Sequence, residues 1–170
     1  MKPCNVVVGL CNPKSPSNVG AVMRAAGCYR VCAVRYSGER FARAAKYHTD
    51  TKNINAKIPL ESTRCILENI PAEMAIVCVE LVEGAEPLPE FEHPNQAIYI
   101  FGPEDGSIEQ AVIDRASAVV YVPTIGCMNL AATVNVVLYD RMAKSLGAID
   151  HNRRIKASRD VNNRLSYSPI

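Results

Sequence analysis

Three short stretches of the sequence combine glycine or proline with a few polar side chains that are able to do chemistry. The first is NVGAVMR, in which Asn18, Gly20 and Arg24 stand at the start of an otherwise apolar helical stretch. The others are FGPEDGS, which contains Glu104, and VPTIGCMNL, which contains Asn129. Gly20 and Arg24 are one turn apart, so a ligand that approaches the glycine meets a guanidinium. Such a charge suits the stabilisation of negative charge on a reacting oxygen.

Each stretch taken alone also has an ordinary structural explanation. Glycine, proline and small polar residues are the usual residues of turns, and an arginine on a helix is often a surface residue whose stem covers apolar neighbours. FGPEDGS contains no G-x-G-x-x-G pattern, and no GK[ST] follows any expected strand. The sequence therefore gives little support to a dinucleotide-binding or P-loop site.

The elements that must position these stretches alternate between strands and helices. Strands are expected at residues 4–11, 31–36, 75–81, 96–102 and 118–123. Helices are expected at 18–29, 61–70, 107–117 and 130–146, with Asn18 or Ser17 capping the first and Gly147 ending the last. Continuously apolar strands that alternate with helices are typical of an α/β fold with a parallel sheet covered by helices on both faces. Ligands of such sheets bind beyond the carboxyl ends of the strands, so the three stretches are expected to meet at one edge.

The composition is that of an ordinary globular domain. The chain has 170 residues, of which 48% are hydrophobic and 21% charged, and its net charge is +2, which suits one domain with a sizeable core. Its apolar runs are too short to span a bilayer and its start lacks a cleavable signal pattern, so a cytoplasmic protein is expected. The seven cysteines form no C-x-x-C pair and lie near no histidine. This favours reduced, mostly buried thiols and no metal site.

The end of the chain is rich in cations. Residues 150–170 contain five arginines or lysines and two aspartates, a balance that suits the neutralisation of phosphates. A solvated and partly disordered tail explains the same composition equally well.

Together, the three stretches resemble the three motifs of the SPOUT RNA methyltransferases, in the TrmH branch that methylates ribose 2′-hydroxyls. The motifs are N-x-G-x-x-x-R at Asn18, Gly20 and Arg24; a strand that ends in Gly102, Pro103 and Glu104; and Val122 and Pro123 followed by Cys127, Met128, Asn129 and Leu130. Each motif is short, but their order and spacing are specific, and the resemblance runs from residue 4 to about residue 147. The chain is similar to the minimal members of the branch, which lack an added RNA-binding domain and modify the wobble ribose of tRNA anticodons.

The resemblance implies S-adenosylmethionine as the cofactor, RNA as the substrate, with tRNA favoured and rRNA as the alternative, and a homodimer with its two sites near the interface. It also implies a C-terminal trefoil knot, so residues 1–150 would form one knotted SPOUT domain and residues 151–170 a basic tail. The residues that it implicates in cofactor binding are Val79, Glu80, Gly102, Val122, Cys127, Met128 and Leu130. Those that it implicates in catalysis are Asn18, Arg24, Glu104 and Asn129.

The family assigns Arg24 a role in activating the 2′-hydroxyl. Arginine side chains stay protonated at ordinary pH, so Arg24 is expected to stabilise the alkoxide as it forms. Asn18 is expected to hold the loop or the ribose, and Glu104 to orient Arg24 or the backbone.

Cys127 stands where the family usually has a serine, and a thiol is the weaker hydrogen-bonding group. The family also usually has a glycine three residues after the glutamate, whereas here Gly106 is two residues after Glu104. These two departures keep open a non-catalytic module that binds RNA or a nucleotide. A second alternative is a methyltransferase that acts on another atom, such as a base nitrogen.

Overall fold

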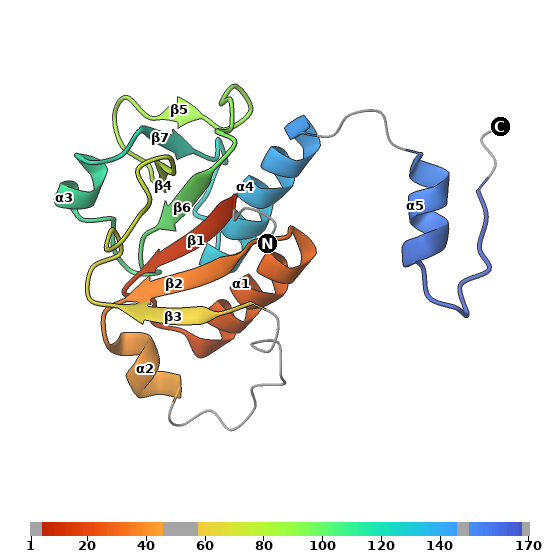
Figure 1. Cartoon of the computed structure of the whole chain (residues 1–170), viewed down its shortest axis with the longest axis horizontal. Helices are drawn as coiled ribbons and strands as arrows, with labels where there is room; N and C mark the ends of the chain where they lie inside the picture. Colours follow the sequence, from red (N-terminus) through yellow and green to blue (C-terminus); the bar gives the residue numbers. More distant parts are fainter. Residues whose placement is uncertain (1–4, 46–57, 146–149, 168–170) are drawn as a thin grey trace.

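The computed structural model describes residues 5–45, 58–145 and 150–167. Its centre is a seven-stranded sheet with the order β3-β2-β1-β6-β4-β7-β5, in which all paired strands are parallel (Figure 1). The strands are β1 (Val6–Cys11), β2 (Ala33–Ser37), β3 (Leu60–Thr63), β4 (Ala75–Val79), β5 (Glu86–Pro87), β6 (Ala97–Phe101) and β7 (Ala118–Tyr121). The helices are α1 (Pro16–Cys28), α2 (Arg40–Ala45), α3 (Gln110–Ile113), α4 (Leu130–Ser145) and α5 (His151–Ser158).

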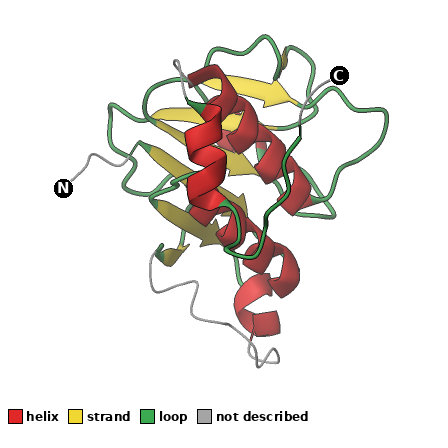
Figure 2. Ribbon diagram, turned by 90° about the vertical axis from the view of Figure 1, so that its right-hand side faces the viewer, coloured by secondary structure: helices red, strands yellow, loops and turns green. Residues whose placement is uncertain are grey.

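Two apolar cores lie on opposite faces of the sheet, because successive residues of a strand point to opposite sides. Val6, Val8 and Leu10 of β1 pack with the buried side chains of α1 and α4. Val7 faces the other way and packs in a second core with residues of the 64–74 segment and α3. In Figure 2 the long helices lie in front of the strands. None of the described helices is long and apolar enough to cross a bilayer.

Helix α1 begins earlier than the sequence predicts. The Ser15 hydroxyl accepts a hydrogen bond from the backbone N–H of Asn18 at 3.3 Å, and Pro16 occupies the first turn. Ser15 is therefore the N-cap, and the predicted caps, Asn18 and Ser17, are wrong. This leaves the Asn18 side chain free for contacts with distant parts of the chain.

The register of the sheet brings the carboxyl ends of four central strands to one edge. Leu10 of β1 lies opposite Phe101 of β6, Phe101 opposite Val79 of β4, and Val79 opposite Val120 of β7. The loops that follow these strands therefore meet, which is the arrangement that the parallel sheet predicts.

Two of the predicted helices are wrong in type or length. Residues 61–70 form most of β3 and a series of turns, because Leu60–Thr63 pairs with β2 and Asn69 takes a left-handed φ of 53°. The helix expected at 107–117 shortens to α3, four residues long. The edge strands β3 and β5 were not expected, while Cys4, the predicted start of the first strand, and Gly147, the predicted end of the last helix, lie outside the described residues.

The described cysteines are less buried than expected. Only Cys78 is buried among them, whereas Cys28, Cys65 and Cys127 are exposed. Burial is the main cause that raises the pKa of both Cys11 and Cys78 to about 12. These two side chains therefore stay as thiols near neutral pH.

A polar cluster fastens the segment before β6 to helix α4. The Nδ1 atom of His93 lies 2.7 Å from the Tyr99 hydroxyl, and its Nε2 atom lies 2.8 Å from Oδ2 of Asp140. Arg141 donates to the same hydroxyl at 3.0 Å, and Lys144 pairs with Asp140 at 2.8 Å. A neutral His93 with its proton on Nε2 satisfies these contacts, since it donates to Asp140 and accepts from the Tyr99 hydroxyl. Burial lowers the pKa of His93, although Asp140 opposes this shift.

Candidate active site

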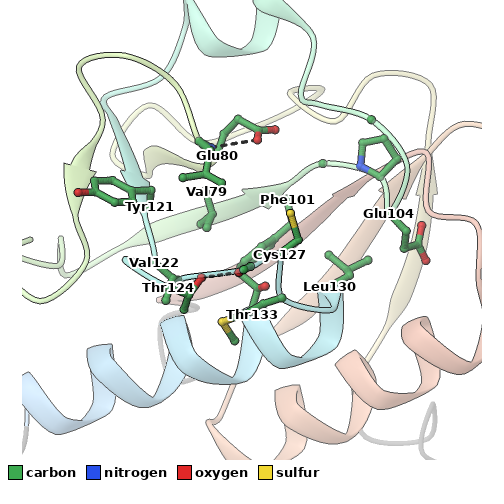
Figure 3. Close-up of a pocket in the computed structure, with 16 residues that line it drawn as sticks. Val79, Glu80, Phe101, Glu104, Tyr121, Val122, Thr124, Cys127, Leu130 and Thr133 are labelled. Carbon is green, nitrogen blue, oxygen red and sulfur yellow. Dashed lines mark hydrogen bonds between the residues drawn. The ribbon is translucent and has the colours of Figure 1, made fainter.

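A pocket of about 220 Å³ opens at the carboxyl edge of the sheet. It lies where the loops after β4, β6 and β7 meet the start of α4 (Figure 3). The residues predicted to bind a cofactor all line it: Val79, Glu80, Gly102, Val122, Cys127, Met128 and Leu130. The pocket therefore combines apolar walls with loop backbone and two carboxylates, those of Glu80 and Glu104, a mixture typical of small-molecule sites.

Glu80 joins two of the loops around this pocket. Its Oε2 atom accepts from the backbone N–H of Ile108 at 2.9 Å, and its Oε1 atom accepts from that of Leu81 at 3.0 Å. Gly102 lies directly against this contact, since a Cβ at this position would stand 3.2 Å from Glu80 Oε2 and 3.2 Å from the nitrogen of Ile108. A larger side chain at Gly102 would therefore displace the loop that forms the pocket wall.

One chain of hydrogen bonds connects the three motifs. The Asn18 amide donates to Oε1 of Glu104 at 2.9 Å, and the Asn129 amide donates to Oδ1 of Asn18 at 3.0 Å. Oδ1 of Asn129 accepts from the backbone N–H of Ala131 at 2.9 Å, so this residue caps helix α4. Both asparagine side chains thus form hydrogen bonds with other parts of the chain and fix the positions of the loops.

Glu104 anchors the loop that precedes α1. Besides Asn18, its carboxylate accepts from the backbone N–H groups of Lys14 at 2.8 Å and Ser15 at 3.0 Å. Partial burial acts to raise the pKa of Glu104, but the hydrogen bond from Asn18 and those from the backbone outweigh it, so the pKa lies below its usual value. Glu104 was expected to orient either Arg24 or the backbone. The contacts show that it holds the backbone before α1.

Sequence reasoning missed a second contact of the same loop. Arg40 donates to both carboxylate oxygens of Asp105, at 2.8 and 2.9 Å, and the Lys14 ammonium lies 3.5 Å from Asp105. The hydrogen bond from Arg40 is the first cause that lowers the pKa of Asp105. Asp105 directly follows Glu104, so its position in the sequence was a usable signal. Arg40 comes from α2, and no spacing in the sequence connects it with this loop.

Arg24 stands apart from the pocket. Its side chain is exposed on α1 and does not line the pocket, and the ion pairs found among the described residues do not include it. It follows Asn18 by six residues, which is about 9 Å along a helix axis. A Cβ on Gly20 would meet nothing within 4 Å, so packing within the chain does not require that glycine.

The fold and the three joined motifs are those of the SPOUT class of RNA methyltransferases. Residues 5–139 match the SpoU rRNA Methylase family, which is most of the chain. The chain belongs to this family.

Several solved structures share this fold. The SpoU methyltransferase AviRb from Streptomyces viridochromogenes in complex with AdoMet has a TM-score of 0.66 and 14% identity, covering 85% of this chain and 62% of that one. The TrmH/SpoU tRNA modifying enzyme of A. aeolicus has a TM-score of 0.66 and 15% identity, covering 91% of this chain and 87% of that one. A structure solved to study 2-OH methylation of C/U34 on tRNA has a TM-score of 0.64 and 21% identity, covering 85% of this chain and 92% of that one. This chain thus spans about three fifths of AviRb but most of the other two, and no curated protein matches it.

Proposed function

We propose that this protein transfers the methyl group of S-adenosylmethionine to a ribose 2′-hydroxyl of RNA, with tRNA as the favoured substrate. The observation that carries the proposal is the hydrogen-bonded chain from Glu104 through Asn18 to Asn129. It joins all three motifs beside a pocket that contains every residue predicted to bind the cofactor. The tRNA assignment is supported by the similarity in fold to a structure solved to study 2-OH methylation on tRNA.

The pocket residues fit the cofactor by their chemistry. Gly102 leaves room beside the backbone that a Cβ would fill, and the loop from Val122 to Leu130 offers backbone groups at the pocket wall. S-adenosylmethionine supplies a methyl group that is already activated on a sulfonium. The protein must therefore mainly align the ribose oxygen and stabilise it as its proton leaves. We also expect the knotted path of the family in this C-terminal part of the chain.

Arg24 is the residue that we assign to this stabilisation. Its guanidinium carries a fixed positive charge, which is worth most where negative charge develops only in the transition state. The described residues place no carboxylate in an ion pair with it, so its charge is available to the RNA.

The position of Arg24 favours a dimer in which each site is completed by the second copy. Arg24 does not line the pocket of its own chain. The exposed side of α1 around it carries the small residues Ser17, Gly20 and Ala21, which allow another helix to approach closely. A site shared across a two-fold axis would use this face of α1 twice.

The function is tested with S-adenosylmethionine that carries a labelled methyl group, incubated with separated tRNA and rRNA fractions. The account predicts transfer to tRNA and loss of both cofactor binding and transfer in Gly102→Val, because the added side chain displaces the pocket wall. Binding of the cofactor without transfer to any RNA would instead favour the non-catalytic module. Cysteine at position 127, which lines the pocket, is the observation that keeps this module as the second candidate.

A further inference from the structure

The positive charge of the chain is concentrated at its C-terminal end. Residues 150–170 contain five arginines or lysines and two aspartates, a net charge of +3, whereas the whole chain carries only +2. The preceding 149 residues, which include the site, therefore carry −1. RNA binding depends largely on cations that neutralise phosphates. A methyltransferase body with a slight negative charge obtains little of this attraction from its own net charge.

Helix α5 presents this charge in an ordered and accessible form. Asp150 caps its start, because its carboxylate accepts from the backbone N–H of Arg153 at 3.0 Å. All its residues are exposed, and none of them is acidic. In Figure 1 it lies to one side of the sheet and the other helices, and among the described residues Arg154 donates to the sulfur of Met142 in α4 at 3.9 Å.

The spacing of the cations on α5 is unfavourable for an isolated helix. Arg153 and Lys156 are three residues apart, so like charges lie next to each other on the helix surface, and a further cation, Arg159, follows directly after the helix. A helix of eight residues without a buried face is also marginal in water. A polyanion bound along the helix would remove this repulsion, whereas the protein's own acidic residues do not pair with it among the described contacts.

From this charge distribution we infer that α5 and the residues after it form an arm that binds the phosphate backbone of the RNA substrate. The arm holds the RNA near the methyltransferase site and takes no part in the transfer itself. This inference rests on the proposed function, since it names how that site obtains its substrate. Arg153, Arg154 and Lys156 are the contacts that we assign to phosphates.

The test measures binding of full-length protein to a total tRNA fraction over a range of salt concentrations. Arg153→Gln combined with Arg154→Gln is expected to weaken binding roughly tenfold and to reduce the slope of log affinity against log salt by between about one and two, since each lost phosphate contact removes ~0.7–0.9. Arg153→Lys combined with Arg154→Lys keeps the charge and should bind nearly as the parent does. Arg115→Gln removes an exposed cation between α3 and β7, outside the arm, and should change little.

Two further readouts separate this inference from the proposed function. Cofactor affinity and the single-turnover rate with saturating tRNA should be unchanged in the glutamine variant. If the parent methylates tRNA but the variant binds it as tightly as the parent, the arm is not an RNA contact and the methyltransferase proposal stands. If the parent binds tRNA through the arm but transfers no methyl group, the arm stands as an RNA contact and the methyltransferase proposal fails. A variant that changes the oligomeric state would show that α5 binds a second copy, and a parent that binds no tRNA overturns both proposals.

Discussion

The single residues proposed for the site differ in what their polar atoms contact. Glu104, Asn18 and Asn129 use their polar atoms on one another and on the backbone. Arg24 is exposed, and the ion pairs found among the described residues do not include its guanidinium. We therefore propose that Asn18, Glu104 and Asn129 are positioning residues whose loss disturbs the pocket, and that the loss of Arg24 affects the reaction alone.

Arg24→Ala tests this separation. It should bind S-adenosylmethionine nearly as the parent does and lose on the order of a hundredfold in single-turnover methylation, the usual scale for a lost electrostatic stabiliser. Arg24→Lys should restore little, because an ammonium does not reproduce the planar guanidinium. Calorimetry and single-turnover assays of both variants give the two quantities. If Arg24→Ala methylates saturating RNA at the parent rate, this arginine takes no part in the reaction.

At the scale of elements, the contact between the segment before β6 and helix α4 depends on a neutral histidine. The folded state lowers the pKa of His93, so the unfolded chain binds a proton more readily. The stability from this contact is present above the unfolded pKa of about 6.5 and is lost as the pH falls through the folded value. The free energy of unfolding should therefore decrease between pH 7.5 and pH 5.5 by more in the parent than in His93→Gln. Chemical denaturation at both pH values measures this, and equal decreases would contradict it.

The sequence was sufficient to predict the elements that carry their own pattern. Apolar strands and the amphipathic α1 are local signals, and the parallel arrangement of the strands explains why the three motifs meet at one edge. The 61–70 segment was misassigned because its Ile66 and Leu67 suit a helix as well as turns packed on a sheet. The pairing of Arg40 with Asp105 depends on where α2 lies, and nothing in the local sequence encodes that position.

At the scale of the whole molecule, the proposed dimer explains why Arg24 lies outside its own pocket. Mixed dimers of Arg24→Ala chains and Gly102→Val chains test whether Arg24 acts on the site of the other copy. Each variant alone should be nearly inactive, but the mixed dimer contains one intact pocket faced by one intact arginine and should recover about half of the parent activity. Differently tagged chains allow the mixed species to be purified. If Arg24 acts within its own chain, the mixed dimer stays as inactive as its components, and light scattering that finds only monomers would remove the shared site altogether.

The central claim is that the methyl group reaches a ribose oxygen of RNA, and the most direct measurement is to find the modified atom. Unmodified tRNA is treated with the parent protein and labelled S-adenosylmethionine, then digested to nucleosides and analysed by mass spectrometry, with Gly102→Val as the inactive control. The account predicts a 2′-O-methylated nucleoside whose label remains on the ribose after the glycosidic bond is cleaved. Label that remains on the base after this cleavage would contradict the account and identify a base methyltransferase instead.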